Sequence, residues 1–333
     1  MSGGRSGQTG KKLSILEDLI TMRHFMHMMF QWRRLRMAAL ACLALPLAAC
    51  GGGSSPSSTT MNLGITDGPV DSASAVVVSF IGVELQPSSG KAITFNFQTP
   101  ETINLLNEQN GNQASLLSGV SVPAGNYAWI RLLLNVQSNG TVANSYIEIN
   151  GAQYPLIIPS GAQTGLKLVQ GFTMTANQVA NFTIDFMLQQ SITAPPGLTS
   201  GGIQDYILKP ALRLVNDVQA GTISGTVALS TLQSNSACLN GYSGSGPLPN
   251  AHVYVFSGTV TPSSTLTPVV EPQITLSASG SYGYDQPFLL AGSYTLAVAC
   301  TSTSSTGTTT VAFLPPAGEP ATVTANQTAT VNF

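Results

Sequence analysis

Carboxylates are the reactive side chains in best supply after residue 50. Asp67, Asp71, Asp185 and Asp205 are the candidates for site chemistry. Two facing carboxylates act as acid and base in glycoside hydrolysis, and carboxylates combined with backbone carbonyls bind calcium. Asp67 and Asp71 flank Gly68-Pro69 on one turn, so they are the candidate calcium ligands. That turn lacks the dense acidic spacing of a calcium loop, and Asp67 capping its own turn is the alternative.

Histidine, the usual general base in hydrolases, is scarce. His24 and His27 precede residue 50, which leaves His252 within the predicted strand 251–256. We expect this side chain on the solvent face of the strand. The stretch Gly241-Tyr242-Ser243-Gly244-Ser245 lacks the final glycine of a G-x-S-x-G nucleophile motif. The sequence therefore predicts no enzyme, no cofactor and no zinc site.

The segment before Cys50 has the pattern of an export signal. Arg33, Arg34 and Arg36 form a basic cluster, and the uncharged run 37–49 follows. This run is too short to span a bilayer but fits the apolar region of a signal peptide. Leu47-Ala48-Ala49-Cys50 then resembles the lipobox of bacterial lipoproteins, which implies a diacylglycerol on the sulfur of Cys50. An ordinary secretory signal with an incidental cysteine is the alternative.

The flanks of the lipobox imply a location. Gly51, rather than aspartate, follows the cysteine, which by resemblance to enteric lipoproteins favours the outer membrane of a Gram-negative bacterium. We expect residues 1–49 to be removed, and residues 1–30 are longer than such a signal needs. Residues 50–60 contain GGGSSPSSTT, a flexible tether. The expected membrane contact is therefore an N-terminal lipid.

Two further cysteines follow the tether. With Cys42 removed and Cys50 lipidated, Cys238 and Cys300 remain. An even pair in an exported protein predicts a disulfide, and two free thiols are the alternative.

Charge excludes one class of partner. Without residues 1–49, five basic and twelve acidic residues remain, for a net charge of −7. A chain so poor in Lys and Arg cannot neutralise a run of phosphates, so nucleic-acid binding is not expected.

The chain after the tether predicts an all-β fold. Short apolar or alternating runs separated by turn residues are typical of strands. Asn150-Gly151, between two such runs, predicts a hairpin, and residues 112–117 predict one helical turn. The expected strands of the first half are 75–85, 93–97, 129–136, 145–149, 152–158, 182–188 and 206–215. Strand 182–188 alternates as a half-buried strand does.

Residues 61–217 resemble the domain of unknown function 4382. The motifs that carry this resemblance are Thr66-Asp67-Gly68-Pro69-Val70-Asp71, Phe95-Asn96-Phe97, Pro123-Ala124-Gly125-Asn126-Tyr127, Ser145-Tyr146-Ile147, Pro159-Ser160-Gly161, Gly165-Leu166-Lys167-Leu168 and Leu208-Lys209-Pro210. The family is found in exported proteins, often lipoproteins, and has no established activity. Gly68 stands where it often has alanine, and Asn96 where it often has aspartate.

Residues 218–333 are similar to the carboxypeptidase regulatory-like, or transthyretin-like, β-sandwich. The shared features are short glycine and tyrosine signatures, among them Leu290-Ala291-Gly292-Ser293-Tyr294. The same Ala-Gly-x-Tyr step occurs at Tyr127, and a tyrosine there can bond across a sandwich corner. The expected architecture is two tandem β-sandwich domains of related type. Convergent turn chemistry is the alternative explanation.

These patterns favour a lipid-anchored, non-catalytic envelope protein with a binding, structural or adhesive role. An envelope glycan, reached through exposed Tyr242, Tyr282 and Tyr284, or a protein is the expected partner. A calcium-stabilised adhesion module and a hydrolase that uses carboxylates are the alternatives.

Overall fold

The computed structural model describes residues 57–67, 73–109, 111–137, 141–158, 165–193, 206–209, 211–239, 248, 251–303 and 309–333. The signal, the lipobox and Cys50 lie outside these residues. So do Asp71, Asp205 and Tyr242.

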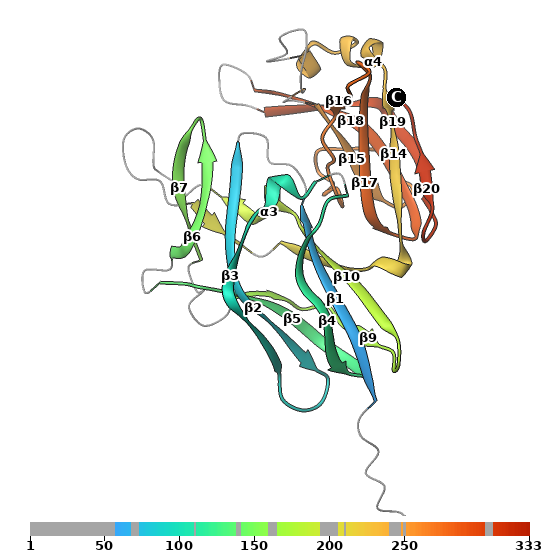
Figure 1. The fold of residues 1–333 in the computed structure, drawn as a ribbon. Helices are drawn as coiled ribbons and strands as arrows, with labels where there is room; N and C mark the ends of the chain where they lie inside the picture. Colours follow the sequence, from blue (N-terminus) through green and yellow to red (C-terminus); the bar gives the residue numbers. More distant parts are fainter. Residues whose placement is uncertain are drawn as a thin grey trace, which may run out of the picture. The chain divides into compact units, whose positions relative to one another are not determined.

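The described chain is almost entirely β-structure, which confirms the predicted fold class (Figure 1). Its helical elements are single short turns. They are η1 (Leu105–Asn107), α3 (Leu188–Ser191), η2 (Asp217–Gln219), α4 (Leu229–Gln233) and η3 (Ser236–Leu239). The strands form four sheets, and the side chains that they bury form two separate hydrophobic clusters.

The first cluster lies among strands β1 to β13, which form the N-terminal sandwich. Its smaller sheet has the order β13-β10-β1-β4, with β1 (Ser58–Asp67), β4 (Ala114–Pro123), β10 (Val179–Phe186) and β13 (Leu212–Asn216). Strand β1 pairs in parallel with β10 and antiparallel with β4, so both of its edges are hydrogen-bonded.

The larger sheet of the N-terminal sandwich is organised around β2 (Ala75–Pro87), which pairs with β3, β5 and β6. Its other strands are β3 (Ile93–Asn104), β5 (Gly125–Leu134), β6 (Thr141–Ile149), β7 (Ala152–Ile157), β8 (Leu166–Leu168), β9 (Phe172–Met174), β11 (Ile192–Thr193) and β12 (Tyr206–Leu208). Strands β6 and β7 form the predicted hairpin. Asn150 and Gly151 have φ of 51° and 76°, as a type I′ turn requires.

The second cluster lies among strands β14 to β20, which form the C-terminal sandwich. One sheet has the order β16-β17-β14-β20, with β14 (Ala220–Val227), β16 (Thr275–Leu276), β17 (Tyr282–Leu290) and β20 (Thr328–Thr330). The other has the order β15-β18-β19, with β15 (Ala251–Ser257), β18 (Gly292–Thr303) and β19 (Thr309–Val323). The predicted disulfide is present and joins Cys238 on η3 to Cys300 on β18. Both cysteines are fully buried.

Three local predictions were wrong. The expected strand 206–215 is two strands, because β12 pairs with β7 in the larger sheet and β13 pairs with β10 in the smaller one. Residues 114–117 begin strand β4 rather than a helical turn, because they pair with β1. Strand β10 is not half-buried: Phe182 to Phe186 are all buried, including Thr183 and Asp185. Its polar side chains are paired with other polar groups: Asp185 with Arg213, and Thr183 with Gln113 and Asp217.

Each sandwich has a tyrosine that closes a corner in the same way. The Tyr127 hydroxyl donates to the carbonyl of Pro123 at 2.8 Å, and the Tyr294 hydroxyl donates to the carbonyl of Leu290 at 2.7 Å. Both tyrosines reach back four residues across an Ala-Gly turn. Burial raises the pKa of both phenols, although the positive charge of Arg213 opposes this for Tyr294.

Among the described residues, no helix has the length and apolar character needed to span a membrane.

Candidate functional site

Asp67 and Asp185, two of the carboxylates that the sequence suggested for acid–base catalysis, do not face each other in the structure. In the register of β1 and β10, Thr66 lies opposite Asp185 and Asp67 lies opposite Phe186. Because neighbouring residues of a strand point to opposite faces, the side chains of Asp67 and Asp185 leave the sheet on opposite sides. They cannot flank one substrate bond.

Asp185 is engaged in an ion pair. Arg213 faces it across the β10–β13 ladder, and its Nη2 donates to Asp185 Oδ2. The side chain of Asp185 is 3% exposed and that of Arg213 is 15% exposed. A carboxylate held this way positions a strand and is not available as a general acid or base.

Asp67 is also buried, at the end of β1, where its backbone N–H donates to the carbonyl of Glu108 at 3.0 Å. Its proposed calcium partner Asp71 lies outside the described residues. Within the described ranges, no group of three or more His, Cys, Asp or Glu side chains is placed to hold a metal ion.

We expected His252 on the solvent face of its strand, and this prediction was wrong. The residue is 2% exposed. It lies on β15 opposite Ala299 of β18, and a bridge to Gln273 joins the other edge of β15 to the segment 269–273. This proline-containing segment gave no strand pattern, so the sequence could not show that it pairs with the edge of β15.

The tyrosines expected to be exposed are buried. Tyr282 and Tyr284 are 6% and 4% exposed and belong to the C-terminal core. The Tyr284 hydroxyl donates to the carbonyl of Val331 at 2.8 Å, and burial raises its pKa. Both residues point inward because Gly283 between them occupies the outward position of the strand. The prediction that Tyr282 and Tyr284 are exposed and contact a glycan is therefore wrong.

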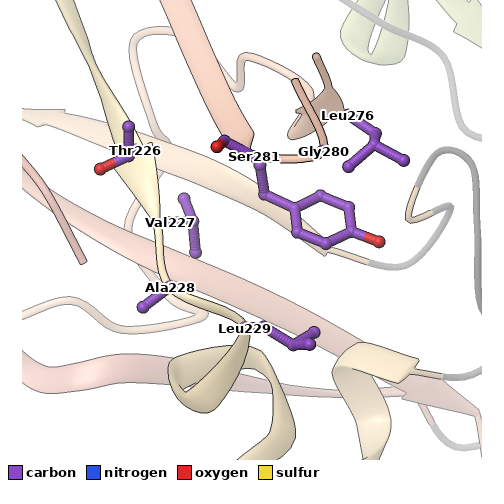
Figure 2. Close-up of a pocket in the computed structure, with 8 residues that line it drawn as sticks. Thr226, Val227, Ala228, Leu229, Leu276, Gly280 and Ser281 are labelled. Carbon is purple, nitrogen blue, oxygen red and sulfur yellow. The ribbon is translucent and has the colours of Figure 1, made fainter. Parts of the chain in front are cut away.

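A pocket of about 560 Å³ opens between Leu229 and Leu276 in the C-terminal sandwich (Figure 2). One wall is the end of β14 and the start of α4, and the other is the turn between β16 and β17. Its lining residues are Thr226, Val227, Ala228, Leu229, Leu276, Gly280, Ser281 and Tyr282. Leu229 is 41% exposed, which is high for a leucine side chain.

Hydrogen bonds fix the turn wall. Ser277 N–H donates to the carbonyl of Ser281 at 2.8 Å, and Gly280 N–H donates to the carbonyl of Ser277 at 2.9 Å. Ser281 N–H also donates to Ser277 Oγ at 3.1 Å. Gly280 has a φ of 82°, which glycine adopts without strain.

The opposite wall is fixed by the C-terminal residues. Thr226 N–H and Oγ1 both donate to Asn332 Oδ1, at 2.8 and 3.0 Å. Ala228 N–H donates to the carbonyl of Phe333 at 2.6 Å. From Leu229 the chain enters α4, and η3 follows with the cysteine that is bonded to β18. Hydrogen bonds thus hold both walls in place.

The chemistry of the pocket is neutral and mixed. Thr226 and Ser281 supply hydroxyls, while Val227, Leu229 and Leu276 supply apolar surface. None of the described lining residues carries a formal charge at neutral pH. Sequence reasoning missed this pocket because its walls lie about 50 residues apart and contain no motif.

The N-terminal sandwich belongs to a known sequence family. The model of the family described as "Domain of unknown function (DUF4382)" matches residues 58–210. Residues 58–210 are a DUF4382 domain. This confirms the corresponding part of the predicted resemblance, and the DUF4382 domain accounts for the strands from β1 to β12. A comparison with curated proteins finds no similar sequence.

Solved structures give distant likenesses. The Bacillus anthracis TIE protein is 10% identical, with a TM-score of 0.18 over 83% of this chain and 34% of that one. The major pilin subunit BcpA of Bacillus cereus is 11% identical, with a TM-score of 0.18 over 83% and 98%. A putative adhesin from Bacteroides ovatus is 8% identical, with a TM-score of 0.18 over 78% and 82%. The chain thus spans about a third of the TIE protein, and TM-scores this low support no functional argument.

Proposed function

We propose that this protein is a lipid-anchored, non-catalytic component of the cell envelope with a binding, structural or adhesive role. The observation that carries the proposal is the sequence Leu47-Ala48-Ala49-Cys50 and its short distance from the folded chain. Strand β1 begins at Ser58, eight residues after Cys50. At about 3.5 Å per residue, this tether spans about 28 Å when fully extended. A lipid on Cys50 would hold the sandwich next to the bilayer surface.

The attachment of β1 suits a tethered protein. Ser57 and Ser58 already accept backbone hydrogen bonds, from Ala124 at 2.7 Å and from Asn177 at 2.9 Å. The strand then lies between β10 and β4. A pull on the tether is therefore transmitted to a strand that is bonded along both edges, and not to a loose end.

The arrangement of the polar side chains supports a non-catalytic role. Asp67 and Asp185 leave the sheet on opposite faces, Asp185 is engaged by Arg213, and His252 is buried. The identity of residues 218–333 as a carboxypeptidase regulatory-like domain and the placement in a Gram-negative outer membrane are parts of the same proposal.

Metabolic labelling with palmitate tests the anchor. We expect label in the wild-type chain and in Cys42→Ser, a matched control eight residues upstream, but none in Cys50→Ser. Cys50→Ser should also leave the membrane fraction. Label that persists in Cys50→Ser, or that appears in none of the three chains, would overturn the proposal.

A further inference from the structure

We propose that the outer face of the larger sheet in the N-terminal sandwich contacts an anionic bilayer surface and binds the phosphates of its lipid headgroups. This inference rests on the proposed function, because the lipid on Cys50 is what brings this face to a membrane. We call it the basic face, and it consists of Glu84, Gln86, Lys91, Trp129, Arg131 and Lys167.

Strand pairing brings the charged side chains of the basic face together. Arg131 of β5 lies opposite Glu84 of β2 on one side and opposite Lys167 of β8 on the other. Trp129 lies two residues before Arg131 in the same strand, so both side chains point to the same face. Ile130 and Leu132, which alternate with them, are both 1% exposed and belong to the core. The charged row therefore lies on the outer face.

Two of these side chains are like charges held next to each other. Arg131 and Lys167 are directly opposite across the β5–β8 ladder, an arrangement that destabilises a sheet. The Arg131 guanidinium carbon and Lys167 Nζ lie 4.7 and 4.4 Å from the centroid of the Trp129 ring. Arg131 Nη1 also donates to Glu84 Oε2 at 2.9 Å, whereas Lys167 has no ion pair among the described residues. A phosphate between the two cations would offset their repulsion.

The turn between β2 and β3 adds a third cation to this face. Gln86 lies opposite Trp129 and so shares the outer face with it. Gln86 Nε2 donates to the carbonyl of Gly90 at 3.1 Å, which holds the turn toward this face. Lys91 follows Gly90 and is exposed.

The charge of the basic face is opposite in sign to that of the rest of the protein. It carries three cations and one carboxylate, so its net charge is 3 − 1 = +2. The whole chain after residue 49 has a net charge of −7, which leaves −7 − 2 = −9 for the remainder. An anionic surface therefore attracts this face and repels the others.

The basic face lies at the end of the sandwich where the tether attaches. Ala124 N–H donates to the carbonyl of Ser57 at 2.7 Å, and β5 begins at the next residue. Ser88 N–H in the β2–β3 turn donates to the carbonyl of Asn126 at 2.8 Å, so this turn lies at the same end (Figure 1). Trp129 is five residues beyond Ala124, about 17 Å along the strand. The extended tether of about 28 Å exceeds this distance, so an anchored chain can place the face on the bilayer.

The residue types of this region suit a lipid surface. Tryptophan is enriched at the headgroup level of membranes because its ring is amphipathic. Lysine and arginine are attracted by anionic headgroups. Val169, two residues after Lys167, is 75% exposed, and it is the most exposed of the described large hydrophobic side chains. Covering such a side chain with lipid removes apolar surface from water.

The fluorescence of Trp129, the sole tryptophan after Cys50, tests the contact directly. The chain 50–333 contains every described strand, and Cys50 is its free thiol because Cys238 and Cys300 are bonded to each other. Coupling Cys50 to a maleimide lipid places this chain on vesicles, in which brominated lipids quench a tryptophan that contacts them.

We expect at least twofold stronger quenching in vesicles with about 30% phosphatidylglycerol than in pure phosphatidylcholine. About 0.5 M salt should remove this difference. Equal quenching in the two kinds of vesicle, no quenching in either, or a difference that salt leaves unchanged would overturn the inference.

A pair of charge variants tests the site. Lys167→Gln removes a cation from the basic face, and Lys209→Gln removes the same charge beyond β12, a strand that pairs with neither β2 nor β5. We expect quenching in the anionic vesicles to fall at least twofold in Lys167→Gln and to stay constant in Lys209→Gln, with both chains folded by circular dichroism. Each value compares brominated with ordinary lipid for one variant, so a change in the emission of Trp129 itself cancels.

Equal quenching in the two variants would overturn the inference. Because the maleimide lipid takes the place of the native one, this result is independent of whether Cys50 is lipidated in the cell. Failure here therefore leaves the anchor proposal standing, and failure of palmitate labelling leaves this measurement unchanged.

Discussion

The two sandwiches share a tyrosine-closed corner but are held together by different chemistry. The N-terminal one has the larger buried core and an ion pair between Asp185 and Arg213. The C-terminal one has a smaller core and a disulfide between Cys238 and Cys300. Small cores bury too little apolar surface for independent stability and often need a covalent link. The two sandwiches therefore differ in the interaction that supplements the hydrophobic core, which is an ion pair in the first and a disulfide in the second.

The amino-acid composition of each sandwich explains why one has the ion pair and the other the disulfide. All five lysine and arginine residues after Cys50 precede residue 218, so an ion pair built on either residue type must take its cation from the N-terminal sandwich. The C-terminal sandwich has no lysine or arginine to pair with a buried acid, and burial raises the pKa of its Asp285. A covalent bond needs no such partner.

Removing one member of the buried ion pair should have the largest effect. Arg213→Met leaves the Asp185 carboxylate buried without its cation, and we expect a loss of about 3–5 kcal/mol in the free energy of unfolding. Trp129 is the sole tryptophan after Cys50, so its fluorescence during urea unfolding follows the N-terminal sandwich.

Two controls sharpen this measurement. Glu84→Gln breaks the pair with Arg131, in which both side chains are about a fifth exposed, and keeps the contact between Arg131 and the ring of Trp129; it should cost about 1 kcal/mol or less. Arg213→Met combined with Asp185→Leu should recover most of the loss. Equal costs for Arg213→Met and Glu84→Gln would show that the buried pair has no special role.

Breaking the disulfide should have the next largest effect and should spare the N-terminal sandwich. The bond closes a separation of 62 residues, for which we expect a loss of about 2–4 kcal/mol in Cys300→Ala. Hydrogen exchange should increase across β15 and β18, while the urea midpoint of Trp129 fluorescence stays constant. Increased exchange in β1 and β10 would contradict the separation of the two cores.

The tyrosine corners test whether the two sandwiches are equivalent in this one feature. Tyr127→Phe and Tyr294→Phe each remove a single hydroxyl that donates to a carbonyl four residues upstream. We expect each change to cost about 1 kcal/mol. Costs that differ by more than about 2 kcal/mol would show that the corners are similar in geometry but not in energetics.

Alkaline pH should have the smallest effect and should distinguish the sandwiches. Burial raises the pKa of Tyr127 in the first sandwich and of Tyr284 and Tyr294 in the second, from an ordinary value of 10.0. The unfolded chain therefore releases these protons first, so stability is full below pH 10 and falls as pH rises above it. We expect the steeper fall in the C-terminal sandwich, measured by hydrogen exchange. A steeper fall in the first would contradict this assignment.

Local signals predicted the local structure well. Asn150-Gly151 gave the β6–β7 hairpin, and both Ala-Gly-x-Tyr steps led into strands. The Cys238–Cys300 bond was predicted because the expected removal of Cys42 and lipidation of Cys50 leave two cysteines to pair. In each case the determining residues lie within a few positions of each other or belong to a rare residue type.

Burial depended on distant segments and was predicted less well. His252 lies on a strand whose edge is bridged by the distant segment 269–273, and Asp185 is paired with Arg213 on the neighbouring strand β13. The pocket combines the end of β14 with a turn about 50 residues later. Alternation along one strand shows which residues share a face, but it does not show what packs against that face.

The most direct test of the account is the mass of the N-terminal peptide from protein extracted from membranes. We predict a chain that begins at Cys50 and carries a diacylglyceryl group on its sulfur. A chain that extends upstream of Cys50, or one that begins there with an unmodified thiol, would contradict the proposed anchor.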